Sequence, residues 1–174
     1  MGTAEFYETG ADFMSRILVA FFSASSGGVT AGVGKRMAEA VGADVFAIAP
    51  EQPYTEAELN WKNPFARCNR EKIGGKDVPF AGSAGDLSQY DLILIGFPIW
   101  YGGAPNVVRT FLRQSDFSGR RIGVFATSGG SKIGKSAEKL RPYLDGSTVI
   151  AGSRLFSPAD SDETLAAWVR SCEA

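Results

Sequence analysis

The sequence contains no histidine and only two cysteines, Cys68 and Cys172. The absence of histidine excludes the Ser-His-Asp and Cys-His forms of nucleophilic catalysis, and it excludes a histidine-ligated metal site. Two cysteines far apart in the chain indicate free thiols in a reducing compartment rather than a disulfide framework. We therefore assign no catalytic residue and no metal ligand, and we expect the chain to take its chemistry from a cofactor.

An excess of charge of one sign and a long apolar run are also missing. The 18 basic and 19 acidic residues give no reason to expect binding to nucleic acid or to a membrane surface. The longest strand-like apolar run, Ile17 to Phe22, is far shorter than the ~18 residues that a membrane span needs. Residues 1–15 read as an N-terminal extension whose acidic residues fit neither a signal peptide nor an anchor. These absences predict a cytoplasmic protein.

What the sequence does contain is an alternation of strand and helix patterns along a chain of ordinary single-domain length. Apolar and β-branched runs predict strands over residues 17–22, 43–48, 92–97, 121–127 and 148–156. Helical spacing predicts helices that start at Thr30 and Pro105, one over about 132–144, and a last one capped by Asp160 or Ser161. Strands separated by helices imply a parallel sheet covered on both faces, and five strands suit the order 2-1-3-4-5. We expect one three-layer α/β domain over residues 16–174.

The loop after the first strand, Ser23-Ala-Ser-Ser-Gly-Gly-Val-Thr30, is rich in hydroxyls and glycine. Hydroxyls donate hydrogen bonds to anions, glycines let backbone N–H groups approach closely, and the start of the next helix adds a favourable dipole. Charge-assisted bonds contribute roughly 1.5–3 kcal/mol each, so about five or six would hold a phosphate dianion without a lysine. The loop predicts a phosphate site, and a flexible Ser/Gly turn is the alternative.

Other folds and motifs that handle phosphate do not match. A Walker loop is excluded because Gly34-Lys35 is followed by Arg36 and because Val29 stands five places before Gly34, where glycine is required. No glycine triple has the spacing of the dinucleotide fingerprint, and a phosphatase loop would need a cysteine at this place. A receiver-like signalling domain would need acidic residues at the end of the first strand, where two phenylalanines stand.

The loop after the third strand, Pro98-Ile-Trp-Tyr-Gly-Gly-Ala104, is uncharged and carries two large aromatic side chains. In an open parallel sheet this end of the strand is where ligands bind, and aromatic rings there suit stacking on a flat heteroaromatic ring. Gly102 and Gly103 would let a peptide reorient and offer a carbonyl to a protonated ring nitrogen. The alternative is that Trp100 and Tyr101 cover the core or a subunit interface.

The loop after the fourth strand, Thr127-Ser-Gly-Gly-Ser131, is again small, hydroxylated and uncharged. It can bring backbone N–H groups against the carbonyl edge of a ring. The alternative is a tight strand-to-helix turn. Only in combination with the other two loops does it indicate a binding site.

With these three loops the sequence resembles the flavodoxin family, and within it bacterial flavodoxins and flavodoxin-like FMN proteins with a Pro-Ile-Trp-x-Gly and a Thr-Ser-Gly-Gly-Ser loop. The likeness runs from about Arg16 to Arg170 and rests on Phe97-Pro-Ile-Trp-Tyr-Gly102 and Thr127-Ser-Gly-Gly-Ser131. It implies a flavodoxin-like fold with FMN as cofactor. It also implies that the first loop binds the FMN phosphate, Trp100 and its neighbours flank the isoalloxazine, and the third loop meets the pyrimidine edge.

The first loop departs from the resemblance, because Ser23 to Thr30 is two residues longer than the family's usual Ser/Thr-x-Thr-Gly-x-Thr. Alignment from the front favours Ser23 and Ser25 as phosphate ligands, whereas alignment from the helix favours Gly28 and Thr30. We therefore keep residues from both ends of the loop as predicted phosphate ligands. The predicted cofactor-binding residues are Ser23, Ala24, Ser25, Ser26, Gly28, Thr30, Pro98, Ile99, Trp100, Tyr101, Gly102, Thr127, Ser128, Gly129, Gly130 and Ser131.

The least regular stretch, residues 50–87, contains an expected short helix at 55–61 and a polar segment around Arg67, Asn69 and Glu71. One interpretation of the polar segment is a lip beside the flavin for a substrate or partner. The other is a solvated helix with an Arg67–Glu71 pair at i,i+4 spacing.

Two functions fit these expectations. The first is an electron carrier whose FMN takes one or two electrons and which docks redox protein partners. The second is an NAD(P)H-dependent oxidoreductase that reduces a quinone or a similar small acceptor. The near-neutral charge favours the second, since strongly acidic surfaces help dedicated carriers find basic partners.

Overall fold

The structure is a computed structural model that describes residues 15–24 and 27–174. The predicted ligands Ser25 and Ser26 and residues 1–14 of the predicted extension lie outside the described residues. Five parallel strands form one sheet in the order β2-β1-β3-β4-β5, as predicted. The strands are β1 (Ile17–Phe21), β2 (Asp44–Ala47), β3 (Leu92–Pro98), β4 (Arg121–Thr127) and β5 (Val149–Leu155).

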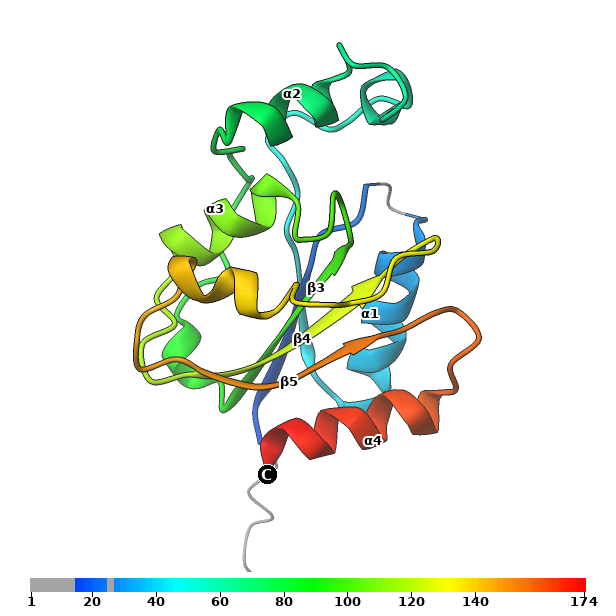
Figure 1. Cartoon of the computed structure of the whole chain (residues 1–174). Helices are drawn as coiled ribbons and strands as arrows, with labels where there is room; N and C mark the ends of the chain where they lie inside the picture. Colours follow the sequence, from blue (N-terminus) through cyan, green and yellow to red (C-terminus); the bar gives the residue numbers. More distant parts are fainter. Residues whose placement is uncertain (1–14, 25–26) are drawn as a thin grey trace, which may run out of the picture.

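Helices cover both faces of the sheet (Figure 1). One face carries α1 (Val29–Val41) and α4 (Asp162–Glu173), and the other carries α3 (Asn106–Gln114) and the short 3-10 helix η3 (Glu138–Tyr143). A further 3-10 turn, η2 (Leu87–Gln89), precedes β3. The three-layer α/β sandwich expected from the sequence is therefore confirmed.

The core consists of two layers, because successive side chains of a strand point to opposite faces of the sheet. In β1, Val19 and Phe21 pack with α1 and α4, whereas Leu18 and Ala20 pack on the side of α3. Both sets are buried, and this explains why β1 reads as a continuous apolar run instead of an alternating one.

The C-terminal end of α1 and the N-terminal end of α4 lie at the residues that the sequence indicates. Gly42 adopts the left-handed conformation, with φ of 67°, and its N–H donates to the carbonyl of Ala38, which ends α1. Ser161 caps α4 by accepting a hydrogen bond from the Thr164 N–H at 3.2 Å. Of the two predicted caps, Ser161 is thus the residue used.

The helix predicted over about 132–144 is wrong in length and type. The structure has turns up to Ala137 and then only the 3-10 helix η3. Pro142 lies inside η3 and has no N–H to donate to a helical hydrogen bond. Gly134 adopts a positive φ of 51°, which is incompatible with a regular helix at this position. The expected helix at 55–61 is likewise reduced to the 3-10 turn η1 (Ala57–Leu59).

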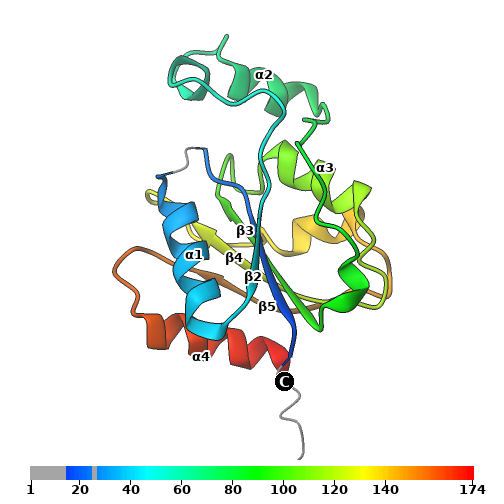
Figure 2. The ribbon, with the colours of Figure 1, turned by 180° about the vertical axis from the view of Figure 1, so that it is seen from behind.

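The segment between β2 and β3 extends past the carboxyl ends of the strands. Its helix α2 (Arg67–Gly74) lies above that edge of the sheet, together with η1, and Figure 2 shows the same arrangement from behind. In the described part of the chain no helix is both long and apolar enough to cross a membrane.

Candidate functional site

The three predicted loops meet at one edge of the sheet, because the carboxyl ends of parallel strands lie on the same side (Figure 1). Two adjoining cavities open there. The first, of about 400 Å³, is called the helix-end cavity and is lined by Ser23, Ala24, Gly28, Val29, Thr30, Pro98, Ile99, Trp100, Thr127, Ser128, Gly129, Phe156, Ser157 and Pro158. The second, of about 550 Å³, is called the aromatic cavity and is lined by Ala24, Leu59, Trp61, Cys68, Ile99, Trp100, Tyr101, Ser128, Gly129, Gly130 and Ser131.

The two cavities share Ala24, Ile99, Trp100, Ser128 and Gly129 as lining residues. They therefore form one elongated site with two chemically different ends. Among the predicted site residues that the structure describes, Gly102 alone lines neither cavity. The role of these residues as cofactor ligands stays a prediction.

The helix-end cavity has the features of an anion site. The N-cap of α1 is Gly28, which has no side chain to satisfy the first N–H groups of the helix. The first turn of α1 carries no acidic residue, and the positive end of the helix dipole points at this cavity. Half-buried Ser23 adds a hydroxyl from the end of β1.

A buried pair of hydroxyls ties α1 to β4 at the floor of this cavity. Thr30 Oγ1 and Thr127 Oγ1 lie 2.7 Å apart, and both residues are buried. One of the two hydroxyl protons makes this hydrogen bond, so the other proton is free to be donated to a bound anion. The pair joins the first and third predicted loops, a contact across 97 positions of sequence.

Trp100 forms a wall common to both cavities. Its ring packs edge-on against Phe22 at a centroid distance of 5.4 Å and against Tyr54 at 5.5 Å. These contacts fix the ring and leave it half-buried, with a surface facing each cavity. Trp100 therefore packs against the core and also lines both cavities, and its stacking on a ligand ring stays a prediction.

Tyr101 and Gly102 form a tight turn at the tip of the second loop. Both have positive φ, 53° and 73°, and Trp100 and Gly103 exchange hydrogen bonds of 2.9 and 3.1 Å across the turn. Positive φ at both central positions is the mark of a type I′ turn, and Gly102 supplies the residue that tolerates it best. The Gly102 carbonyl accepts a hydrogen bond from Lys139 Nζ at 2.8 Å.

The Tyr101 side chain links this turn to α2. Its hydroxyl donates to the Asn69 side-chain carbonyl and lies 3.6 Å from Cys68 Sγ. Burial raises the pKa of Tyr101 to about 12, so the hydroxyl keeps its proton at neutral pH and remains a donor.

The third loop uses part of its own hydrogen-bonding capacity. Ser128 Oγ accepts from the N–H groups of Gly130 at 3.2 Å and Ser131 at 2.7 Å. A Cβ atom added at Gly129 or Gly130 would meet no atom within 4 Å. Packing within the protein therefore does not require glycine at either position, and the loop leaves space for a ligand.

The polar segment reaches the aromatic cavity through Cys68. Arg67 Nε donates to Glu71 Oε1 at 2.6 Å, as the i,i+4 spacing predicts, and its guanidinium lies 4.2 Å from the ring centroid of Tyr54. The Tyr54 hydroxyl donates to Glu71, and burial together with this carboxylate raises the pKa of Tyr54. The Arg67–Glu71 pair is therefore present but largely buried rather than solvated, and the role of the segment as a lip for a substrate or partner stays a prediction.

Sequence reasoning missed several lining residues, among them Val29 in the first loop. Leu59, Trp61 and Cys68 reach the aromatic cavity from the irregular stretch after β2, well beyond the end of that strand. Phe156, Ser157 and Pro158 reach the helix-end cavity directly after β5, and the rule that ligands bind beyond strand ends would have found them.

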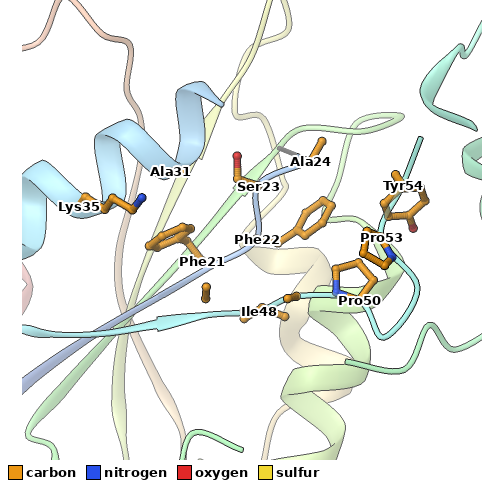
Figure 3. Close-up of a pocket in the computed structure, with 12 residues that line it drawn as sticks. Phe21, Phe22, Ser23, Ala24, Ala31, Lys35, Ile48, Pro50, Pro53 and Tyr54 are labelled. Atoms are coloured by element: carbon orange, nitrogen blue, oxygen red, sulfur yellow. The ribbon is translucent and has the colours of Figure 1, made fainter. Parts of the chain in front are cut away.

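A third cavity, of about 270 Å³, lies on the other side of Ser23 and Ala24. Figure 3 shows Lys35 of α1 reaching toward Phe21 on one side of it, with Tyr54 on the opposite side. Among the described residues that line it, Lys35 is the only charged one. This cavity shares Ser23 and Ala24 with the helix-end cavity but contains no residue of the second or third predicted loop.

Comparison with known proteins agrees with this architecture. The family model described as flavodoxin matches residues 16–172. The chain is 35% identical to a protein provisionally assigned as a flavoprotein from Bacteroides eggerthii DSM 20697, with a TM-score of 0.81, over 92% of this chain and 99% of that one. A similar protein from Bacteroides uniformis ATCC 8492 is 35% identical, with a TM-score of 0.78 and coverage of 90% and 98%.

A more distant structure shares the fold. It is the flavoprotein in complex with FMN from Lactobacillus acidophilus NCFM, which is 19% identical, with a TM-score of 0.62 and coverage of 81% and 93%. No curated protein gives a significant match to the chain. The family match extends over almost the whole sheet and its three loops. The chain belongs to the flavodoxin family.

Proposed function

We propose that the chain binds FMN, with the phosphate in the helix-end cavity and the isoalloxazine ring in the aromatic cavity. The observation that carries the proposal is the pair of adjoining cavities, one built from a helix N-terminus and hydroxyls and the other from aromatic side chains. A molecule with a phosphate at one end and a flat ring at the other matches the chemistry of the two cavities. The complex of the distant Lactobacillus flavoprotein with FMN supports the same assignment.

The donors in the helix-end cavity suit a phosphate dianion. The N–H groups at the start of α1, Ser23 and the free proton of the Thr30–Thr127 pair are donors, and no carboxylate is among the described residues that line the cavity. Hydrogen bonds to a charged group contribute roughly 1.5–3 kcal/mol each, so this set is sufficient without a paired cation.

FMN, when bound, supplies the redox chemistry by accepting one or two electrons. The residues of the chain orient the ring and control its surroundings. Trp100, fixed by Phe22 and Tyr54, would offer a flat face to the ring, and Tyr101 and Trp61, which line the same cavity, would lie beside it. The amides of the third loop lie beside the same space.

We further propose that the protein is an electron carrier that exchanges electrons with redox proteins. The second candidate is an NAD(P)H-dependent oxidoreductase acting on quinones or similar acceptors. Its supporting observation is the absence of Asp and Glu from the linings of both cavities, within the residues that the structure describes. Without a carboxylate in the described lining, an anionic fully reduced flavin would meet less repulsion, which favours two-electron turnover.

The cytoplasmic location is also a proposal. It rests on Cys68 and Cys172, which are free and buried, as expected in a reducing compartment. Cell fractionation with detection of the tagged full chain would test it, and recovery outside the cytoplasm would contradict it.

The test of function is a turnover assay on the purified, FMN-loaded protein. A carrier is expected to show a flavin absorption spectrum, no steady-state NAD(P)H oxidation with a quinone, and reduction by an added flavodoxin reductase. Steady oxidation of NADH or NADPH that depends on both protein and quinone would overturn the carrier assignment in favour of the oxidoreductase. A protein that neither contains flavin nor quenches the fluorescence of added FMN would contradict both.

A further inference from the structure

Three cationic side chains from three different elements meet behind the Tyr101–Gly102 turn. Lys72 comes from α2, Arg109 from α3 and Lys139 from η3. A Cβ atom added at Gly103 would lie 3.5 Å from Arg109 Nη2 and 3.7 Å from Lys139 Cδ, so both side chains lie against the turn. Lys72 and Tyr101 line the same small pocket. We call these three residues the cation cluster.

The charges of the cation cluster are not compensated. Within residues 15–24 and 27–174, none of its three members takes part in an ion pair. The nearby carboxylates are already engaged, since Glu71 pairs with Arg67 and Asp77 pairs with Arg113. A local positive site is therefore present although the net charge of the chain is −1.

Arg109 is the most unusual member. Its Nε is buried and has no hydrogen-bond partner in the described part of the protein. Its guanidinium lies 5.5 Å from the ring centroid of Tyr143, which orients the group without neutralising it. Burial lowers the pKa of Lys72, and the charges of Arg109 and Lys139 lower it further. An anion placed among the three would relieve this repulsion.

The cation cluster is adjacent to the aromatic cavity. Tyr101 lines that cavity, and the next residue, Gly102, accepts the hydrogen bond from Lys139. Only the Tyr101–Gly102 turn separates the two. A small molecule with its reactive ring at the aromatic cavity could therefore reach the cluster with an anionic substituent.

We propose that Lys72, Arg109 and Lys139 form a binding site for the anionic group, phosphate or sulfonate or carboxylate, of a small electron donor or acceptor that reacts at the flavin. This inference rests on the proposed FMN site. A small ligand fits better than a protein carboxylate because the cluster lies behind a tight turn and its Arg109 donor is buried. With a quinone acceptor, two electrons and one proton pass from the anionic reduced flavin to the quinone, and a second proton comes from solvent, giving reoxidised flavin and hydroquinone.

The experiment compares charged and neutral acceptors in stopped-flow reoxidation of the dithionite-reduced, FMN-loaded protein. The acceptors are anthraquinone-2,6-disulfonate, which is dianionic, and menadione, which is neutral. The variants are Arg109→Gln, the double change Lys72→Gln with Lys139→Gln, and the control Arg170→Gln on the exposed surface of α4. A parallel arm compares reduction of the oxidised protein by NADPH and by NADH.

We expect each cluster variant to slow the reaction with the disulfonate about tenfold at low salt and the reaction with menadione less than about twofold. Arg170→Gln is expected to leave both rates unchanged, and high salt should remove the advantage of the wild type. A larger loss with NADPH than with NADH would identify a nucleotide phosphate as the ligand, and a loss confined to the disulfonate would identify an acceptor.

Equal losses with both quinones, or an equal loss in Arg170→Gln, would overturn the proposal, as would unchanged rates in every variant. The proposal would also be overturned, in favour of a protein docking surface, if the cluster variants slowed electron transfer only to an acidic redox protein and not to the disulfonate. A measurement on the FMN-free protein distinguishes failure of the anion site from failure of FMN binding. In the FMN-free protein, pyrophosphate should shift the NMR amide signals of Gly102 and Gly103 in the wild type and not in Arg109→Gln.

Discussion

At the scale of single residues, the site depends on side chains that serve the fold and the ligand together. Trp100 packs edge-on against Phe22 and Tyr54 while facing both cavities. Thr30 and Thr127 satisfy each other's buried hydroxyls and leave one proton to donate. Changes at such residues should alter stability and binding at once, so each needs a control that separates the two effects.

Replacing Trp100 with alanine is expected to weaken FMN binding about tenfold, since an aromatic contact contributes roughly 0.5–1.5 kcal/mol beyond its burial. Fluorescence titration of the apoprotein with FMN measures the effect. Trp100→Phe, which keeps a ring beside Phe22 and Tyr54, should recover most of the affinity. If Trp100→Ala binds FMN as tightly as the wild type, Trp100 supports the core only.

Replacing Thr127 with valine is expected to lower the free energy of unfolding by about 1–3 kcal/mol, because the buried Thr30 hydroxyl loses its partner. Urea unfolding of the FMN-free protein measures this loss. The double variant Thr30→Val with Thr127→Val should cost less than the sum of the single changes, since neither hydroxyl is then left unpaired. Strict additivity would show that the two hydroxyls do not interact.

At the scale of elements, close packing between strands sets the positions of the loops. Gly96 of β3 is paired in register with Phe125 of β4, and a Cβ atom on Gly96 would overlap the Phe125 ring. The ring is fully buried in the layer under α1 and α4. Glycine in the middle of this strand is therefore a packing requirement, and it keeps β3 and β4, with their loops, at their spacing.

Gly96→Ala is expected to destabilise the protein by about 3 kcal/mol, because Phe125 must leave its position in a closely packed core. Gly32→Ala is the matched control, since Gly32 lies exposed on α1 with no atom within 4 Å of its added Cβ. That change should stabilise the protein by about 0.5–1 kcal/mol through helix propensity. Thermal unfolding measures the change in stability of both variants. Similar changes at the two positions would contradict the packing argument.

At the scale of the whole molecule, most of the architecture could be predicted from the sequence and some of the site could not. The strands were readable because β1, β3 and β4 are buried on both faces and their runs are continuously apolar. The prediction of a helix over 132–144 was wrong because Gly134 adopts a positive φ and Pro142 has no N–H to donate, so a regular helix does not continue through the segment.

The predicted site residues come together because a parallel sheet brings the ends of its strands to one edge. Trp61 and Cys68 could not be predicted to line it, since they belong to an irregular segment that is placed by tertiary contacts such as Tyr101 with Asn69. The Gly102 carbonyl accepts a hydrogen bond from Lys139, which no pattern in the sequence indicated, and the reorientation of a peptide at Gly102 and Gly103 toward a ring nitrogen stays a prediction. Periodicity contains no information about such contacts.

The central claim is that one site holds a phosphate at the start of α1 and a flavin ring beside Trp100, and the most direct test is a comparison of FMN with riboflavin. The two molecules differ only by the phosphate, so titration of the apoprotein by flavin fluorescence isolates its contribution. We expect FMN to bind at least about a hundredfold more tightly, because two or more charge-assisted hydrogen bonds of roughly 1.5–3 kcal/mol each are lost with riboflavin. Equal affinity for the two, or binding of neither, would contradict the account.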